Sequence, residues 1–177
     1  MTPGLLVSLS GLPGAGKTTL ARGLCRTLRA VHLRIDSIEH ALRAEGFGDG
    51  PGGYVAAYAV AEDNLRLGLT VVADCVNPLA VTRQSWRDAA ARAGAGIVEL
   101  VLTCPDPSEH RRRVENRTLD WPGQRLPAWA DVAAKVVDPW DFTATRIDAG
   151  LPPEDCLVQV LAAVQSAVQS AVRSAAH

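Results

Sequence analysis

Residues Gly11-Leu12-Pro13-Gly14-Ala15-Gly16-Lys17-Thr18 form a complete G-x-x-x-x-G-K-[ST] sequence directly after an apolar run at 5–10. Glycines in such a loop permit positive φ angles, so that backbone N–H groups can curve around a phosphate. An apolar strand before the loop and a leucine-striped helix after it, over 19–28, provide the context that this motif requires. That context argues against the alternative, an ordinary glycine-rich turn. The sequence therefore predicts a site for a nucleoside triphosphate.

The motif also assigns chemistry to single residues. Lys17 supplies a positive charge to the β- and γ-phosphates, and Thr18 supplies a hydroxyl to Mg²⁺. The helix that begins there directs the positive end of its dipole at the anion. We expect ATP and Mg²⁺ as cofactors, and the expected nucleotide-binding residues are Gly11, Pro13, Gly14, Ala15, Gly16, Lys17, Thr18 and Thr19.

Length and composition restrict the class of protein. A chain of 177 residues with 47% hydrophobic and 21% charged residues is typical of one globular domain, which we expect to cover residues 1–177. A net charge of −1 provides no basic field for long nucleic-acid tracts and disfavours a polynucleotide substrate. The run at 5–10 is too short to span a bilayer, so we expect a cytoplasmic protein without a membrane partner. The spacing of the four cysteines and four histidines predicts no structural metal.

Apolar strand-like runs alternate with helical patterns along the whole chain. This alternation predicts an α/β fold with a five-stranded parallel sheet, helices on both faces, and a ligand site at the carboxyl ends of the strands. We expect the strand that ends at Asp36 to neighbour the strand at 5–10. The expected strands are 5–10, 31–35, 70–74, 97–103 and 143–147. The expected helices are 19–28, 37–45, 54–67, 81–93, 108–118, 129–137 and 153–176, with residues 108–137 as a polar helical hairpin that forms a lid.

Asp36 is the carboxylate with the most consequential position. At the end of its strand, it would reach a hydroxyl in line with the γ-phosphate and accept the proton of that hydroxyl, as in a kinase. The alternative is structural, because Asp36-Ser37-Ile38-Glu39 also matches a helix N-cap with a capping-box glutamate.

Asp74 ends a β-branched strand and is a candidate ligand of Mg²⁺ or of substrate. Many strands end in aspartate because it favours turns, and that reading stays open. Asn77, which follows shortly before Pro78, is a candidate for binding the acceptor or for turning the chain.

An arginine-rich segment stands out in this nearly neutral chain. Arg113 and Arg117 are four residues apart and would share one helix face, from which they could close over the triphosphate. The alternative is a solvated face with Glu109 and Glu115 as partners, and that reading applies most to the neighbours 111 and 112. The tryptophans of the region, Trp121, Trp129 and Trp140, are candidates for stacking on a ligand or for packing the hairpin.

These motifs resemble the small P-loop kinases grouped as AAA-type ATPases or zeta-toxin-like kinases, which include chloramphenicol phosphotransferase, gluconate kinase and the kinase domain of polynucleotide kinase. The resemblance covers essentially the whole chain and implies a three-layer P-loop NTPase sandwich with a helical lid. It also implies ATP and Mg²⁺, Asp36 as general base, residues 74–78 beside the acceptor and 113–117 in the lid. Polynucleotide kinases of this type have an arginine where this chain has Glu39, which further disfavours nucleic-acid ends.

The sequence thus predicts an ATP-dependent phosphotransferase acting on a hydroxyl of a small molecule such as an antibiotic, sugar, nucleoside or nucleotide sugar. Its predicted catalytic residues are Asp36, Lys17, Arg113 and Arg117. The predicted substrate ligands are Asp36, Asp74 and Asn77, and the predicted metal ligands are Thr18 and Asp74. The alternative is a nucleotide-binding regulatory protein or slow NTPase. Either would be a monomer or homodimer, and the Gln-Ser-Ala-Val repeat at 165–172 would be a weakly packed extension or an oligomer contact.

Overall fold

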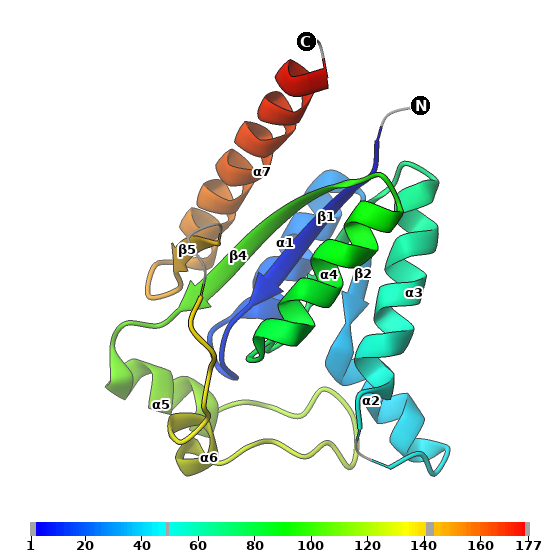
Figure 1. Cartoon of the computed structure of the whole chain (residues 1–177). Helices are drawn as coiled ribbons and strands as arrows, with labels where there is room; N and C mark the ends of the chain where they lie inside the picture. Colours follow the sequence, from blue (N-terminus) through cyan, green and yellow to red (C-terminus); the bar gives the residue numbers. More distant parts are fainter. Residues whose placement is uncertain (1–2, 49, 141–143, 176–177) are drawn as a thin grey trace.

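Five parallel strands form the centre of the molecule (Figure 1). The computed structural model describes residues 3–48, 50–140 and 144–175. The order across the sheet is β2-β3-β1-β4-β5, and every neighbouring pair is parallel. The predicted five-stranded parallel sheet is therefore confirmed. The strands are β1 (Leu5–Ser10), β2 (Val31–Arg34), β3 (Thr70–Asp74), β4 (Gly96–Thr103) and β5 (Thr145–Asp148).

Helices cover both faces of this sheet, as predicted. α1 and α7 pack on one face, where Leu24 and Val160 join the core, and α3 and α4 pack on the other, where Leu65 and Trp86 do so. The helices are α1 (Lys17–Leu28), α2 (Ile35–Ala44), α3 (Gly52–Arg66), α4 (Ala80–Arg92), α5 (Pro107–Glu115), α6 (Trp129–Ala133) and α7 (Pro153–Ala175). Within the described parts of the chain, no helix is long and apolar enough to cross a membrane.

The central strands are apolar because both of their faces are covered. In β1, Leu6 belongs to the core under α3 and α4, whereas Val7 and Leu9 belong to the core under α1 and α7. In β3 the same alternation places Val71 and Val72 on opposite faces, and both are fully buried. Such continuous apolar runs are typical of strands in a parallel sheet.

The position of β2 differs from our expectation, because β3 and not β2 lies beside β1. The composition of the two strands explains the order. β3 is buried from Val71 to Asp74 and suits the interior of the sheet, whereas Val31 and His32 of β2 are only partly buried and suit an edge. As a consequence, the register pairs Leu9 with Asp74, and Asp74 ends directly beside the glycine-rich loop.

Several helix boundaries also differ. α2 begins at Ile35, so Asp36 lies in its first turn and is not the N-cap; the cap position is Arg34, without a side-chain cap hydrogen bond. The capping interpretation of Asp36 is therefore wrong. α3 begins at Gly52, inside the segment that we expected to be a loop, because packing against α2 outweighs the low helix propensity of glycine. The predicted start of the last strand at 143 and the end of the last helix at 176 lie outside the described residues.

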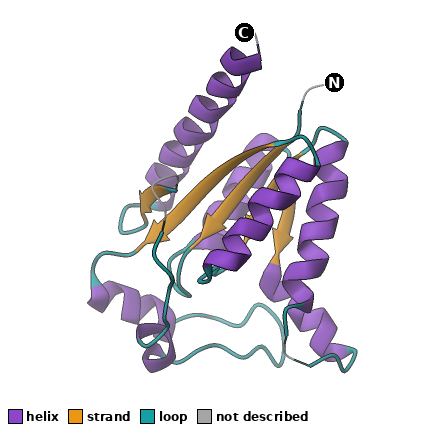
Figure 2. Cartoon of the chain, viewed as in Figure 1, coloured by secondary structure: helices purple, strands orange, loops and turns teal. Residues whose placement is uncertain are grey.

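The lid has less helix than predicted. α5 ends at Glu115, where the Nδ2 atom of Asn116 donates a hydrogen bond to the carbonyl oxygen of Arg112 (2.8 Å), and α6 ends at Ala133. Arg117 thus lies beyond α5 and does not share a helix face with Arg113. From α5 the chain runs as a loop across the carboxyl ends of the strands to α2 and returns to α6 (Figure 2). We call residues 116–128 the crossing loop.

Candidate active site

The glycine-rich loop, which joins β1 to α1, has the backbone that its sequence predicts. Gly14 and Gly16 both have φ of +84°, a conformation that side chains with a Cβ atom rarely adopt. α1 begins at Lys17, so the first N–H groups of the helix have no partner within it and are oriented for an anion. The Nζ atom of Lys17 donates a hydrogen bond to the carbonyl oxygen of Leu12 (3.0 Å).

The Lys17 side chain is buried, with 8% of its surface exposed. Burial lowers the pKa of Lys17, while the negative charges of Asp74 and Asp36 oppose that shift. Asp74 and Asp36 thus favour the ammonium form of Lys17, and this positive charge is the suitable partner for the negative charge of a triphosphate.

Asp74 lies between β2 and the loop. Burial tends to raise the pKa of its carboxyl group, but a hydrogen bond with His32, the charge of Lys17 and a hydrogen bond with Thr18 together hold that pKa below its usual value. Asp74 is thus held as a carboxylate beside the Thr18 hydroxyl. These two oxygen ligands fit Mg²⁺, which usually takes only one or two protein ligands together with phosphates and water.

Asp36 is half-exposed and faces the same space. Its Oδ2 atom lies 3.5 Å from Nη2 of Arg117 and 3.6 Å from Nη2 of Arg34. The first of these partners comes from the crossing loop and the second from β2. Asp36 therefore lies where the end of β2 and the crossing loop meet.

Sequence analysis missed Arg34, which occupies the centre of this charge cluster. Its Nη2 atom donates a hydrogen bond to Oδ2 of Asp120 (2.6 Å), and its Nε atom lies 4.0 Å from Oδ2 of Asp74. The cation also lies 4.9 Å from the ring centroid of Trp121, which in turn packs against His40. The only local signal was its place two residues before Asp36, at the end of a strand that leads into the site.

Arg22 and Asp120 were missed as well. Nη2 of Arg22, on α1, lies 3.4 Å from Oδ1 of Asp120, so two arginines from different elements hold this one carboxylate of the crossing loop. The hydrogen bond with Arg34 and the charge of that residue, followed by hydrogen bonds with Gln124 and Arg22, keep the pKa of Asp120 below its usual value although burial opposes the shift.

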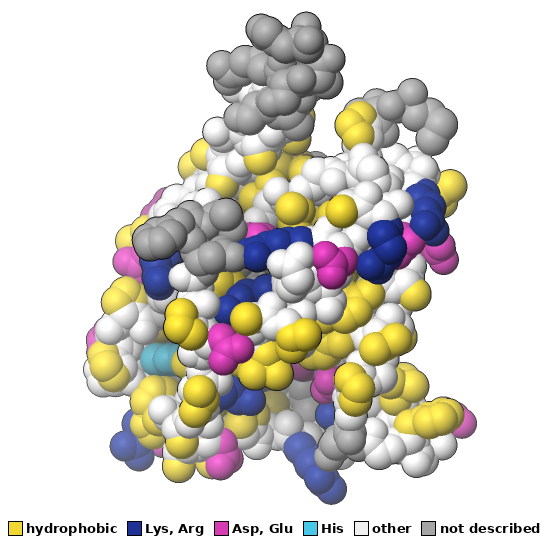
Figure 3. Space-filling model, in the orientation of Figure 1, with side chains coloured by type: hydrophobic (Ala, Val, Ile, Leu, Met, Phe, Trp, Pro, Cys, Tyr) yellow, Lys and Arg dark blue, Asp and Glu magenta, His cyan; other side chains and the backbone are white. Residues whose placement is uncertain are grey.

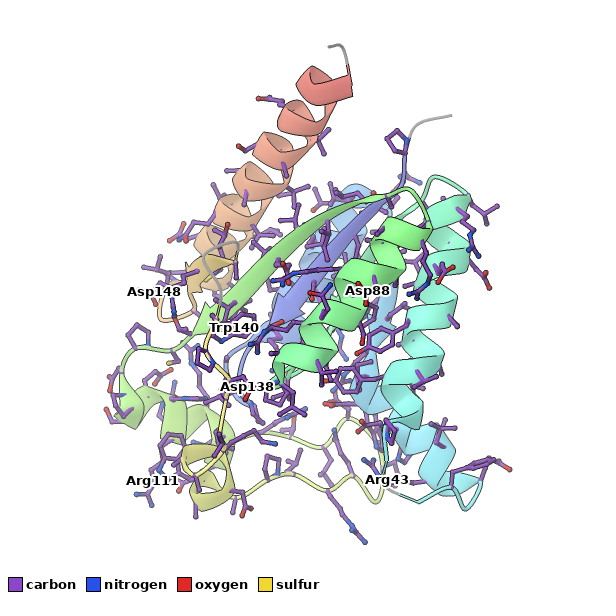
Figure 4. All side chains as sticks on the ribbon, viewed as in Figure 1. Arg43, Asp88, Arg111, Asp138, Trp140 and Asp148 are labelled. Carbon is purple, nitrogen blue, oxygen red and sulfur yellow. The ribbon has the colours of Figure 1, made fainter. Side chains whose placement is uncertain are left out.

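Of the two predicted arginines of the lid, Arg113 is the more constrained. Its guanidinium donates hydrogen bonds to Glu109 and to the carbonyl oxygen of Ala149, yet it lines the cavity. Its neighbours Arg111 and Arg112 pair with Glu115 and Glu109 at the surface, and Arg111 lies by α5 on the outside of the molecule (Figure 4). The solvated interpretation therefore holds for these two.

Three further candidates, Asn77, Trp140 and Trp129, lie away from the open site. Asn77 is buried, and its Nδ2 atom donates a hydrogen bond to Ser10 (3.1 Å) behind the glycine-rich loop. Trp140 lies near Asp138, beside the start of α4 (Figure 4). The guanidinium carbon of Arg83, which belongs to α4, lies 4.3 Å from the centroid of the Trp140 ring. Trp129 packs edge-on against His110. These tryptophans therefore pack the protein, and only Trp121 lies at the site.

The remaining residues meet around a cavity of about 920 Å³ at the carboxyl ends of the strands. The glycine-rich loop, α2 and the crossing loop form its walls. Among the predicted residues, Gly11 and Ala15 of the loop and Asn77 do not line it. Those that do are Pro13, Gly14, Gly16, Lys17, Thr18, Thr19, Asp36, Asp74, Arg113 and Arg117. Arg43, one of the lining residues, is labelled by α2 in Figure 4.

The outer surface contrasts with this cavity. On the face seen in Figure 3, basic and acidic side chains are interspersed among hydrophobic ones, as expected for a chain of net charge −1. This view gives no single-sign field of the kind that binds long nucleic acids.

Comparison with solved structures shows which known proteins share this fold. A gluconokinase from Sinorhizobium meliloti superposes with a TM-score of 0.69 and 18% identity, over 97% of both chains. The APS kinase of Mycobacterium tuberculosis in complex with AMPPNP and APS gives 0.70 and 22%, over 93% of this chain and 99% of that one. Kti12 of Chaetomium thermophilum in complex with ADP-AlF3 gives 0.69 and 20%, over 92% and 98%.

The comparison with curated proteins gives no match. A family model described as AAA domain matches residues 6–135, which cover the sheet from β1 to β4, the glycine-rich loop and the crossing loop. The chain therefore belongs to this AAA domain family, and its fold is that of the small P-loop kinases.

Proposed function

We propose that the protein is an ATP-dependent phosphotransferase that moves the γ-phosphate to a hydroxyl group of a small molecule. The observation that carries this proposal is the position of Asp36. Its carboxylate lines the same cavity as Lys17 and Thr18 and is half-exposed, so a bound hydroxyl could contact it. A nucleotide-binding protein that only switches between states has no need of a carboxylate at this point.

The glycine-rich loop and Lys17 would bind the phosphates, with Lys17 exchanging the carbonyl oxygen of Leu12 for a phosphate oxygen. Thr18 and Asp74 would hold Mg²⁺, which when bound draws charge from the phosphate oxygens. Because Asp74 is buried beside the loop, its carboxylate has few ways to move away from that position.

Transfer then requires one proton and one phosphoryl group to move. Asp36 accepts the proton of the acceptor hydroxyl as the acceptor oxygen bonds to the γ-phosphorus. The bond between that phosphorus and the β–γ bridging oxygen breaks, and the products are ADP and a phosphate ester. Arg117 and Arg113, which both line the cavity, would offset the charge on the transferred group.

The size of the cavity supports a small acceptor. At about 920 Å³ it is in the range that holds a drug-sized ligand, and part of it is taken by the nucleotide. The walls of the acceptor end come from α2, the segment 46–48 and the crossing loop.

The direct test is a phosphoryl-transfer screen with γ-labelled ATP against pooled hydroxyl compounds, with water as the control acceptor. The proposal expects label to leave ATP for one pool, and Lys17→Ala to abolish this transfer. Release of label only as inorganic phosphate, at the same rate in every pool, would instead support the slow NTPase. Absence of ATP binding by the intact protein would overturn both assignments.

A further inference from the structure

We propose that the acceptor carries an anionic group, such as a phosphate, sulfate or carboxylate, in addition to the hydroxyl that is phosphorylated. Arg34 and Arg22 would bind this group at the position that the carboxylate of Asp120 takes here. The inference rests on the proposed kinase activity but concerns a separate part of the cavity, away from the glycine-rich loop.

The first observation is the burial of Arg34. Only 7% of its side chain is exposed, yet it lines the cavity. Its strongest contact is not with a core residue but with Asp120, which belongs to the crossing loop and is 25% exposed. A guanidinium in this position presents a planar fork that matches an oxyanion.

Two donors on this wall make no hydrogen bond, although Nε of Arg34 has Oδ2 of Asp74 as an ion-pair partner at 4.0 Å. The Nε atom of Arg34 and the Nε1 atom of Trp121 are shut off from solvent and have no hydrogen-bond partner among the described residues. The two side chains stack on each other, with the guanidinium carbon 4.9 Å from the ring centroid. Both atoms can only donate, so an oxygen-rich ligand suits them and a further cation or donor does not.

The charge of the cavity leads to the same class of ligand. Seven of its lining side chains are cationic and four are anionic, although the whole chain has a net charge of −1. Lys17 and the lid arginines face the nucleotide in our assignment. The cations that remain for the acceptor end are Arg22, Arg34, Arg43 and Arg125, and the carboxylates there are Asp36, Glu39 and Asp120, of which Glu39 pairs with Arg43.

Asp120 then acts as an internal substitute for the ligand. It places a carboxylate between Arg22 and Arg34, at 3.4 and 2.6 Å, without being part of a strand or helix. An incoming oxyanion of the acceptor would take over these arginines and release Asp120. The same exchange would couple binding of the acceptor to a movement of the crossing loop.

The first experiment measures binding of inorganic sulfate by calorimetry, with the glycine-rich loop already filled by AMPPNP and Mg²⁺. We expect Arg34→Lys, which loses the fork but keeps the charge and the fold, to weaken sulfate binding roughly tenfold. Asp120→Asn, which removes the competing charge, should strengthen it by roughly the same factor. Arg112→Gln, an exposed ion-pair residue outside the cavity, is the matched control and should bind sulfate as the parent does.

Two results would overturn the anion site: sulfate affinity unaffected by Arg34→Lys, or sulfate affinity reduced by Asp120→Asn. If Arg34→Lys weakened AMPPNP and not sulfate, Arg34 would belong to the nucleotide site. Failure of AMPPNP to bind at all would instead contradict the kinase assignment. The anion site could then still be tested by measuring sulfate binding to Lys17→Ala with and without the Arg34→Lys substitution.

The second experiment compares matched acceptors in the transfer assay: neutral polyols, each with its phosphate ester, its sulfate ester and its acid. Transfer confined to anionic members is the expected result, and the preferred member identifies the group. Equal kcat/KM for neutral and anionic members would contradict the proposal. If none of these compounds is phosphorylated, the measurements of sulfate binding decide whether the anion site exists.

Discussion

The Nε2 atom of His110 donates a hydrogen bond to the carbonyl oxygen of Pro13 (2.8 Å), across 97 residues of sequence. This contact joins α5 to the glycine-rich loop, and Val114, one turn later, packs beside Gly14. α5 is therefore anchored to the nucleotide site, and the lid that we expected over 108–137 contains a fixed part. We propose that the crossing loop is the part that moves.

We expect ligands to slow amide hydrogen exchange in 116–128 and to change it little in α5. The crossing loop has few backbone hydrogen bonds; one of them, from Arg117 to Val114, is 3.4 Å long. Exchange should be compared in the free protein, with AMPPNP and Mg²⁺, and with acceptor added. If ligands slowed exchange equally in α5 and the crossing loop, the larger lid over 108–137 would be supported. If ligands left exchange unchanged in both segments, neither would act as a lid.

Gly14→Ala should destabilise the protein more than Gly16→Ala. Both residues have φ of +84°, so both substitutions incur the left-handed strain of roughly 1–2 kcal/mol. A Cβ atom at Gly14 would also lie 2.6 Å from Cγ2 of Val114, whereas a Cβ atom at Gly16 would have no atom within 4 Å. Overpacking of this kind adds roughly 1–3 kcal/mol, measurable by urea unfolding.

A double-mutant cycle checks the cause of that difference. Val114→Ala removes the clashing methyl group, so Gly14→Ala combined with Val114→Ala should lose less stability than the sum of the two single losses. Strict additivity would show that α5 does not press on the loop.

Binding of ATP with Mg²⁺ should raise the melting temperature, and Lys17→Ala should abolish turnover. At a ligand concentration one hundred times Kd the expected stabilisation is about 2.7 kcal/mol. Calorimetry and thermal unfolding of the same preparations provide the measurement. A Lys17→Ala variant with parental kcat would contradict the assignment of this loop.

Asp36→Asn should lower kcat by roughly 10²- to 10⁴-fold, with ATP affinity nearly unchanged, because proton abstraction acts in the transition state. Stability should change little, since the ion pairs of Asp36 with Arg34 and Arg117 are long, at 3.6 and 3.5 Å, and the Asp36 side chain is 44% exposed. Asp88→Asn, on the exposed side of α4, is the control for loss of a carboxylate (Figure 4). A near-parental kcat would remove Asp36 from the catalytic residues.

Stability at acid pH should depend on Asp74. Burial opposes the shift, but His32, Lys17 and Thr18 hold the folded-state pKa of Asp74 below the value of 3.8 that applies when it is unfolded. Its contribution is therefore complete above that unfolded value and is lost as pH falls through the folded pKa. Asp74→Asn should flatten the dependence of the unfolding free energy on pH below about pH 4. An unchanged slope would mean that Asp74 is not held as a carboxylate.

Local sequence patterns predicted most of the fold. The glycine-rich loop, the β-branched strand β3 and the last helix each depend on residues close together in sequence, and the structure has them within a few residues of the expected bounds. The order of β2 and β3 was not predictable in this way, because it depends on which strand the two helical layers bury more completely.

The acceptor end of the site could not be predicted for a similar reason. Arg34 meets Asp120 across 86 residues, and no spacing rule connects them. Asp36 and Lys17 were accessible to sequence analysis because each follows a strand that leads into the site. Arg117 was placed on a helix because the charged pattern continues past 115, whereas Asn116 ends α5.

The position of β5 at the edge of the sheet affects whether two molecules can associate by pairing their strands. It is an outer strand of four residues, and apart from Ile147 its side chains are exposed. Long, flat, apolar outer strands invite backbone pairing with other chains, while brevity and charge discourage it. Arg146 and Asp148 thus protect this border of the sheet from intermolecular strand addition. The polar side chains of β5 thus allow the sheet to end there with an edge that disfavours strand addition.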